Sequence, residues 1–119
     1  HLSDWLAIEL PHAPPPVRQM SVGELAEQLQ AGAVTLVDVR SETDRSLAAI
    51  EGALVLDRET MERLETMPKD TAIAFLCHHG NASMGAAEHF RKQGFTNISN
   101  VVGGINAWSM EIDPSVPRY

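Results

Sequence analysis

Short apolar segments alternate with amphipathic segments along most of this chain, and the alternation limits the folds open to it. Residues 34–39 (VTLVDV) and 71–76 (TAIAFL) are runs of strand length, as expected for strands buried on both faces. Shorter strands are expected at 53–56 and 98–102, with helical periodicity between the strands. This order predicts an α/β domain with an open, mostly parallel sheet of about five strands and helices on both faces.

The expected helices carry recognisable start and stop residues. Ser21 followed by Glu24 is a capping box, and the apolar spacing after it predicts a helix that ends at Gly32. Asp57 is placed to cap a second helix, which Pro68 stops. Further helices are expected at 41–48, from Met84 to Gly94 and around Trp108.

A run of prolines divides the chain near its start. Residues 11–17 (PHAPPPV) favour an extended, semi-rigid spacer. We therefore expect residues 1–17 to form a short helix (2–10) and a linker, and residues 18–119 to form the compact domain. A chain of 119 residues suits one domain, and it buries enough surface to need no metal or disulfide. The first residue is His1, which is consistent with a fragment of a longer protein.

The charge balance argues against two classes of partner. Nine Lys and Arg residues face 16 Asp and Glu residues, a formal net charge of −7, whereas nucleic acids and anionic membranes attract basic surfaces. The apolar segments are too short to span a membrane, and no signal-peptide pattern opens the chain. We expect neither kind of partner and a cytoplasmic location. The single cysteine, Cys77, cannot form an internal disulfide, which fits a reducing compartment.

Residues 77–83 (CHHGNAS) join an expected strand to an expected helix, where ligands bind in parallel sheets. If this loop wraps around Cys77, its backbone N–H groups and the positive end of the helix point at the thiol. Gly80 and Asn81 tolerate the dihedrals of such a turn. Both effects favour the thiolate, since similar sites lower a cysteine pKa from about 8.5 to about 3.5–7.5. The pattern predicts a thiolate that attacks an anionic or electrophilic sulfur.

Each residue of this loop also has a structural interpretation. A lone cysteine at the end of a strand is frequently a core residue. His78 and His79 are able to supply charge, donate hydrogen bonds or move protons, or else they are solvated loop residues. As neighbours they are expected to point in different directions, with at most one facing the thiol. No metal site is expected, because adjacent residues fit tetrahedral ligation poorly and no fourth ligand is evident.

Five segments together resemble the rhodanese-like domain, in the single-domain form of bacterial thiosulfate sulfurtransferases. The resemblance extends from Met20 to Trp108 and includes the loop described above. Each segment is short, but they occur in the family's order and at its usual spacing. The matching segments are 36–40 (LVDVR), 50–53 (IEGA), 77–83 (CHHGNAS), 94–95 (GF) and 102–108 (VGGINAW).

The resemblance implies a sulfurtransferase in which Cys77 is the catalytic residue. Cys77 would take the sulfane sulfur of thiosulfate, or of a similar small anionic donor, as a persulfide and pass it to cyanide or to a small or protein thiol. No metal and no organic cofactor is required. The implied substrate-binding residues are the rest of the loop and one nearby cation: His78, His79, Gly80, Asn81, Ala82, Ser83 and Arg40. The structural alternative for Arg40 is an ion pair with Asp38.

Departures from the family pattern keep two other functions open. Ala82 stands where Arg, Ser or Thr is frequent, Ala49 replaces a histidine and Arg45 replaces an aromatic residue. With the proline linker, these changes suggest a non-catalytic docking or regulatory module tethered to a redox domain such as a monothiol glutaredoxin. A phosphatase or arsenate reductase is the third hypothesis. Those enzymes use C-x5-R, and Ser83 stands where their arginine grips the oxyanion.

Overall fold

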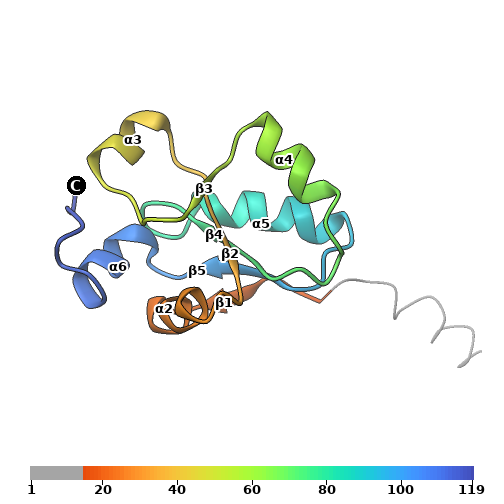
Figure 1. The fold of residues 1–119 in the computed structure, drawn as a ribbon, viewed down its shortest axis with the longest axis horizontal. Coiled ribbons are helices and arrows are strands. Elements are labelled where there is room, and N and C mark those ends of the chain that lie inside the picture. The colour runs from red at the N-terminus through yellow and green to blue at the C-terminus, as the bar shows by residue number, and fades with distance from the viewer. Residues whose placement is uncertain (1–14) are drawn as a thin grey trace, which may run out of the picture.

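Five parallel strands form the central sheet of the computed structural model, which describes residues 15–119 (Figure 1). The sheet order is β1-β5-β4-β2-β3, and every neighbouring pair is parallel. The predicted fold class is therefore confirmed. The strands are β1 (Arg18–Met20), β2 (Thr35–Asp38), β3 (Leu54–Val55), β4 (Ile73–Leu76) and β5 (Ile98–Val101). The helix expected at 2–10 lies outside the described residues.

Helices cover both faces of the sheet. They are α2 (Val22–Gln30), α3 (Glu42–Leu47), α4 (Arg58–Glu65), α5 (Ala82–Lys92) and α6 (Gly104–Glu111). The α2 and α6 helices pack on one face and the α4 and α5 helices on the other. Because β4 and β5 are covered on both sides, all eight of their residues are buried.

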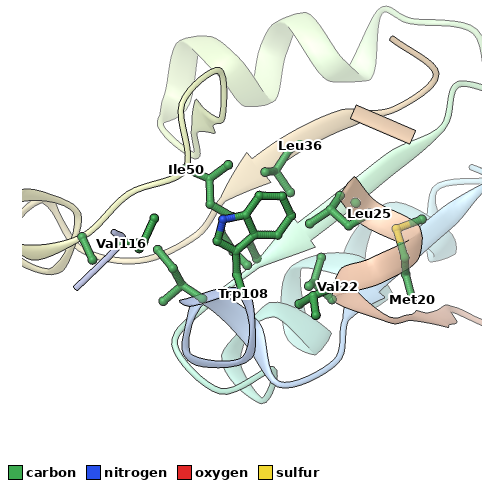
Figure 2. Close-up of a cluster of buried hydrophobic side chains, with 12 residues drawn as sticks. Met20, Val22, Leu25, Leu36, Ile50, Trp108 and Val116 are labelled. Atoms are coloured by element: carbon green, nitrogen blue, oxygen red, sulfur yellow. The ribbon is translucent and has the colours of Figure 1, made fainter. Parts of the chain in front are cut away.

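Two apolar clusters hold these layers together. The indole of Trp108 packs among side chains from α2, β1, β2 and the α3–β3 connection (Figure 2). The cluster on the opposite face contains the aromatic residues Phe75, Phe90 and Phe95, and the Phe75 and Phe90 rings stack at 5.3 Å. Burying a large apolar side chain contributes about 1.5–3 kcal/mol, so these clusters anchor the strand ends on which the site is built.

The predicted helix caps at Ser21 and Asp57 are confirmed. Ser21 Oγ accepts a hydrogen bond from the backbone N–H of Glu24 at 3.1 Å, and Asp57 Oδ1 accepts one from Thr60 at 2.8 Å. The hydrogen bond from the Thr60 backbone lowers the pKa of Asp57. The Glu24 carboxylate, the second half of the expected capping box, accepts instead from Arg18 at 3.5 Å and from Gln28 at 3.2 Å.

The described end of the proline-rich linker lies against the domain. Val17 is buried in the α4–α5 cluster, and the carbonyl of Pro15 accepts a hydrogen bond from Arg91 Nε at 3.0 Å. One residue further on, Arg18 begins β1 and pairs with Ser99 of β5. Val17, counted with the linker in the sequence, therefore belongs to the packed core.

Candidate active site

Cys77 directly follows β4, which lies in the middle of the sheet between β5 and β2. It therefore sits beyond the carboxyl ends of the strands, where α/β sheets bind ligands. Its side chain is only 3% exposed, yet it borders a cavity of about 360 Å³. The cavity is lined by Val39, Arg40, Ser41, Asp44, Cys77, His78, His79, Asn81 and Ala82. The remaining predicted site residues, Gly80 and Ser83, contact the sulfur.

The loop after Cys77 closes around the sulfur atom. The backbone N–H of Gly80 donates to Sγ at 3.0 Å, and Ser83 Oγ lies 3.2 Å from it. Gly80 takes a φ of 97°, a conformation that favours glycine. Asn81 has helical dihedrals, so the tolerance for an unusual conformation that was noted for it is used only at Gly80. The α5 helix begins at Ala82, earlier than expected, and this places Ser83 in its first turn.

Hydrogen bonds make the Cys77 thiol more acidic than an ordinary cysteine. Burial raises the pKa, because it disfavours the charged form. The Ser83 hydroxyl and the backbone N–H groups of Ser83, Gly80 and His79 act in the opposite direction, and the net result is a lowered pKa. The N-terminal end of α5 adds a favourable field for an anion. The surroundings of Cys77 thus favour the thiolate, although most of the side chain is buried.

This pKa shift predicts the pH dependence of Cys77 alkylation. The folded pKa is lowered, so the thiolate fraction and the rate with iodoacetamide should rise and level off at a lower pH than for an unfolded cysteine. A hydrogen bond to a charged group contributes about 1.5–3 kcal/mol, so Ser83→Ala should raise the midpoint by about one to two pH units. The buried Ser99 of β5 provides the control. Ser99→Ala should leave the midpoint unchanged, because the hydrogen bonds that lower the pKa of Cys77 come from Ser83, Gly80 and His79. Equal midpoints for both variants would contradict the role of Ser83.

The start of α6 holds the Cys77 loop (residues 77–83) in place through backbone hydrogen bonds. The backbone N–H of Ile105 donates to the Cys77 carbonyl at 2.9 Å, and that of Asn106 donates to the His78 carbonyl at 3.1 Å. Gly104 allows this approach, because a Cβ at this position would lie 2.3 Å from the Cys77 carbonyl oxygen. Its φ of 60° also favours glycine. With those carbonyls held outward, the loop N–H groups are free to face the sulfur.

Arg40 lines the cavity, but its guanidinium is already hydrogen-bonded to other groups of the protein. Its five N–H groups all have acceptors: the Asp38 carboxylate, the carbonyls of Asp44 and Ala48, and the Tyr119 hydroxyl. The Asp38 Oδ2–Arg40 Nη2 distance is 2.6 Å. These contacts match the structural alternative for Arg40. Its role as a substrate cation stays a prediction that the contacts do not favour.

The rings of the two loop histidines lie against one another at the cavity rim, tilted by 31°. Their ring centroids are 3.9 Å apart, so the expectation that they point in different directions is wrong. The other face of the His78 ring stacks on Tyr119 at 4.0 Å. His78 Nε2 is buried without a hydrogen-bond partner among residues 15–119, and His79 is exposed. Sequence reasoning missed Tyr119, since nothing in a polar C-terminal segment marks it.

Asn100 of β5 is a second residue that the sequence analysis did not single out. Its Oδ1 accepts a hydrogen bond from Ser83 Oγ, and its Nδ2 donates to the Gly80 carbonyl at 3.1 Å. Asn100 is thus linked to the sulfur indirectly, through the Ser83 hydroxyl. The available signal was an asparagine inside an apolar strand, since buried polar side chains require partners.

Residues 15–119 contain neither a metal-binding cluster nor a membrane-spanning helix. No group of three His, Cys, Asp or Glu side chains there is arranged to hold a metal ion. In the same range, no helix combines the length and the apolar character that crossing a membrane requires.

Comparisons with known proteins agree with this fold. The family model for the rhodanese-like domain matches residues 21–111. The adenylyltransferase and sulfurtransferase uba4 of Ogataea parapolymorpha is 35% identical over 96 residues, which cover 78% of this chain and 25% of uba4. A rhodanese-related protein from Thermoplasma volcanium superposes with a TM-score of 0.66 and 28% identity, covering 80% of this chain and 93% of that one. Reduced CoADR-RHD from Bacillus anthracis gives 0.70 and 26%, covering 87% and 18%.

A parallel five-stranded sheet with a cysteine loop at its carboxyl edge defines an α/β domain of the rhodanese type. The family match extends over most of the chain, and the chain belongs to the rhodanese-like domain family. It spans a quarter of the length of the curated relative uba4.

Proposed function

We propose that this domain is a sulfurtransferase that carries a sulfane sulfur on Cys77. The observation that carries the proposal is the position of Cys77 Sγ, which borders a cavity and is surrounded by N–H groups and a hydroxyl. Such an environment stabilises a negative sulfur both before and after transfer. The family includes sulfurtransferases, and uba4 is named as one.

In the proposed first step, the Cys77 thiolate attacks the outer, sulfane sulfur of thiosulfate or a similar small anionic donor. A new S–S bond forms to Sγ while the S–S bond of thiosulfate breaks, and sulfite leaves with the bonding electrons. In the second step, cyanide or a thiolate attacks the outer sulfur of the persulfide, and Cys77 leaves again as a thiolate. The two half-reactions follow one another on one nucleophile, and neither needs an external oxidant or reductant.

The charges around the cavity favour sulfur transfer over phosphoryl chemistry. Phosphate-handling loops of related form hold the oxyanion with a bidentate arginine. Here Ser83 occupies that position, and the guanidinium of Arg40, the arginine lining the cavity, is fully bound by other groups. Asp44 adds a carboxylate to the cavity wall.

The finer parts of the proposal concern partners and location. Matching regions make up 25% of uba4 and 18% of CoADR-RHD, which supports a domain that works tethered to others. We propose a thiol acceptor, small or protein, and a fused redox domain as the tethered partner. A reducing cytoplasm would keep the single thiol of the chain available.

Intact-protein mass spectrometry after incubation with thiosulfate tests the proposal. We expect a gain equal to one sulfur atom, and its loss on addition of cyanide with formation of thiocyanate. Cys77→Ser should show no gain. Sulfate serves as the matched control, because it has the charge of thiosulfate without a sulfane sulfur. An unmodified mass under these conditions, with tight binding of a protein partner that survives Cys77→Ser, would replace the proposal by a non-catalytic docking module.

A further inference from the structure

The Ser83 hydroxyl lies between two groups that compete for its hydrogen. Its oxygen is 3.2 Å from Cys77 Sγ, and it donates a hydrogen bond to Asn100 Oδ1. All three residues are buried, with at most 3% of each exposed. A hydroxyl group has a single hydrogen, so Ser83 cannot donate to the sulfur and to the amide at the same time.

Further contacts fix the Asn100 side chain with its oxygen toward Ser83. The amide nitrogen donates to the Gly80 carbonyl at 3.1 Å and to Gln19 Oε1 at 3.0 Å. The Gly80 carbonyl accepts only, so the nitrogen must lie on that side of the amide. Asn100 therefore presents Ser83 with an acceptor and no donor.

We propose that Asn100 is a positioning residue that turns Ser83 into a hydrogen-bond switch: Ser83 donates to Asn100 when Cys77 is a thiol and to the sulfur when Cys77 is a thiolate. In the thiol, the S–H group donates to Ser83 Oγ, and the Ser83 hydroxyl donates to Asn100 Oδ1. Two hydrogen bonds thus connect the sulfur to Asn100. After the proton leaves to solvent, the sulfur accepts only, and the Ser83 hydrogen turns toward it. The inference deepens the proposed function, because it concerns the same sulfur.

The switch has opposite effects on the two anions of the proposed cycle. Forming the thiolate leaves Asn100 Oδ1 without its donor in a buried place, where an unpaired acceptor is unfavourable. In the persulfide the negative charge lies on the outer sulfur, so Sγ is a weaker hydrogen-bond acceptor. The Ser83 hydroxyl then donates to Asn100 again. Asn100 therefore favours movement of charge away from Sγ, which is the direction of sulfur loading.

The acidity of the thiol reports the state of this switch. Burial raises the pKa of Cys77, and among the groups that lower it the Ser83 hydroxyl is the strongest. Four other titratable side chains border the cavity and are left unchanged by substitutions at Asn100: Arg40, Asp44, His78 and His79. A change in the midpoint of Cys77 alkylation after such a substitution can therefore be attributed to the hydrogen-bond chain.

The test compares the pH midpoint of alkylation by iodoacetamide in the wild-type chain, Asn100→Val and Asn100→Ala. Without Asn100, the hydroxyl has only the sulfur as acceptor, so both variants should raise the thiolate-to-thiol ratio up to about tenfold, a fall of about one pH unit. Ser83→Ala moves the midpoint in the opposite direction. In the double variant Ser83→Ala/Asn100→Val, the Asn100 effect should vanish, because it acts through Ser83. Gln19→Ala should leave the midpoint unchanged.

Several results would overturn the switch. One is an unchanged or raised midpoint in the Asn100 variants. Such a result would mean that the main effect of the substitution is to loosen the loop, because Asn100 no longer donates to the Gly80 carbonyl. An Asn100 effect that persists without Ser83 would also overturn it. If the variants unfold on heating too early to titrate, the wild-type chain still decides, because the Asn100 carboxamide NMR signals must shift at the Cys77 midpoint. A chain that shows the expected midpoints but never gains sulfur would refute the proposed function alone.

Discussion

Gly104→Ala is expected to disrupt the Cys77 loop (residues 77–83) and to lower the free energy of unfolding by about 3 kcal/mol or more. The new Cβ would lie 2.3 Å from the Cys77 carbonyl oxygen and 2.5 Å from that of His78. These atoms are backbone, so no side chain can rotate away to make room. The positive φ of 60° adds strain of its own for alanine.

The loss should extend to Cys77 chemistry. To relieve the contact, α6 must move away from the loop and break the hydrogen bonds from Ile105 and Asn106 to the carbonyls of Cys77 and His78. The peptides that aim N–H groups at the sulfur then lose their orientation. We therefore expect Gly104→Ala to abolish sulfur loading in the mass measurement and to raise the pH midpoint of alkylation.

Gly85 offers a matched control for the same substitution. It lies in α5 with no atom within 4 Å of an added Cβ, so Gly85→Ala should be neutral or should stabilise the helix by about 0.5–1 kcal/mol. Thermal and urea unfolding of both variants, together with their sulfur loading, make the comparison. If Gly104→Ala unfolds and loads sulfur like Gly85→Ala, α6 does not hold the loop.

The parts of the fold that were predicted from sequence rest on local patterns. Apolar runs indicated β2 and β4, and the caps at Ser21 and Asp57 indicated two helix starts. By contrast, β1 is three residues long, with only Met20 buried. It becomes a strand because it pairs with β5, far away in the chain. A short edge strand with no alternation of its own leaves no trace in a single sequence.

The site shows the same division between local and distant contacts. A loop between strand and helix was enough to predict that backbone N–H groups face the Cys77 thiol. Ser83 was named only as a substrate-binding residue implied by the family resemblance, and its hydroxyl contact with the sulfur was not predicted. Asn100 and Tyr119 reach the site from other parts of the chain. Their role depends on the order of strands and on the path of the chain after α6, which local patterns do not encode.

Removing one partner of the Asp38–Arg40 ion pair is the second change with a large expected effect on stability. Both side chains are only 2% exposed, and the oxygen and nitrogen are 2.6 Å apart. Asp38→Leu would leave a buried guanidinium without its counter-charge, which lowers the free energy of unfolding by about 3–5 kcal/mol. Urea unfolding at constant pH measures this change. The exposed Arg58–Glu62 pair is the control, and Glu62→Gln should change stability by less than about 1 kcal/mol.

Replacing both partners separates stability from substrate binding. Asp38→Leu/Arg40→Met removes the two charges together, so it should be less destabilising than Asp38→Leu alone. Every N–H of Arg40 is already bound within the protein, so a folded double variant should still load sulfur from thiosulfate on Cys77. A double variant that folds but stays unmodified would show that Arg40 binds the donor, as the family resemblance implies. A double variant less stable than the single one would mean that the hydrogen bonds from Arg40 to the carbonyls of Asp44 and Ala48 stabilise the fold more than the unpaired charge of Arg40 destabilises it.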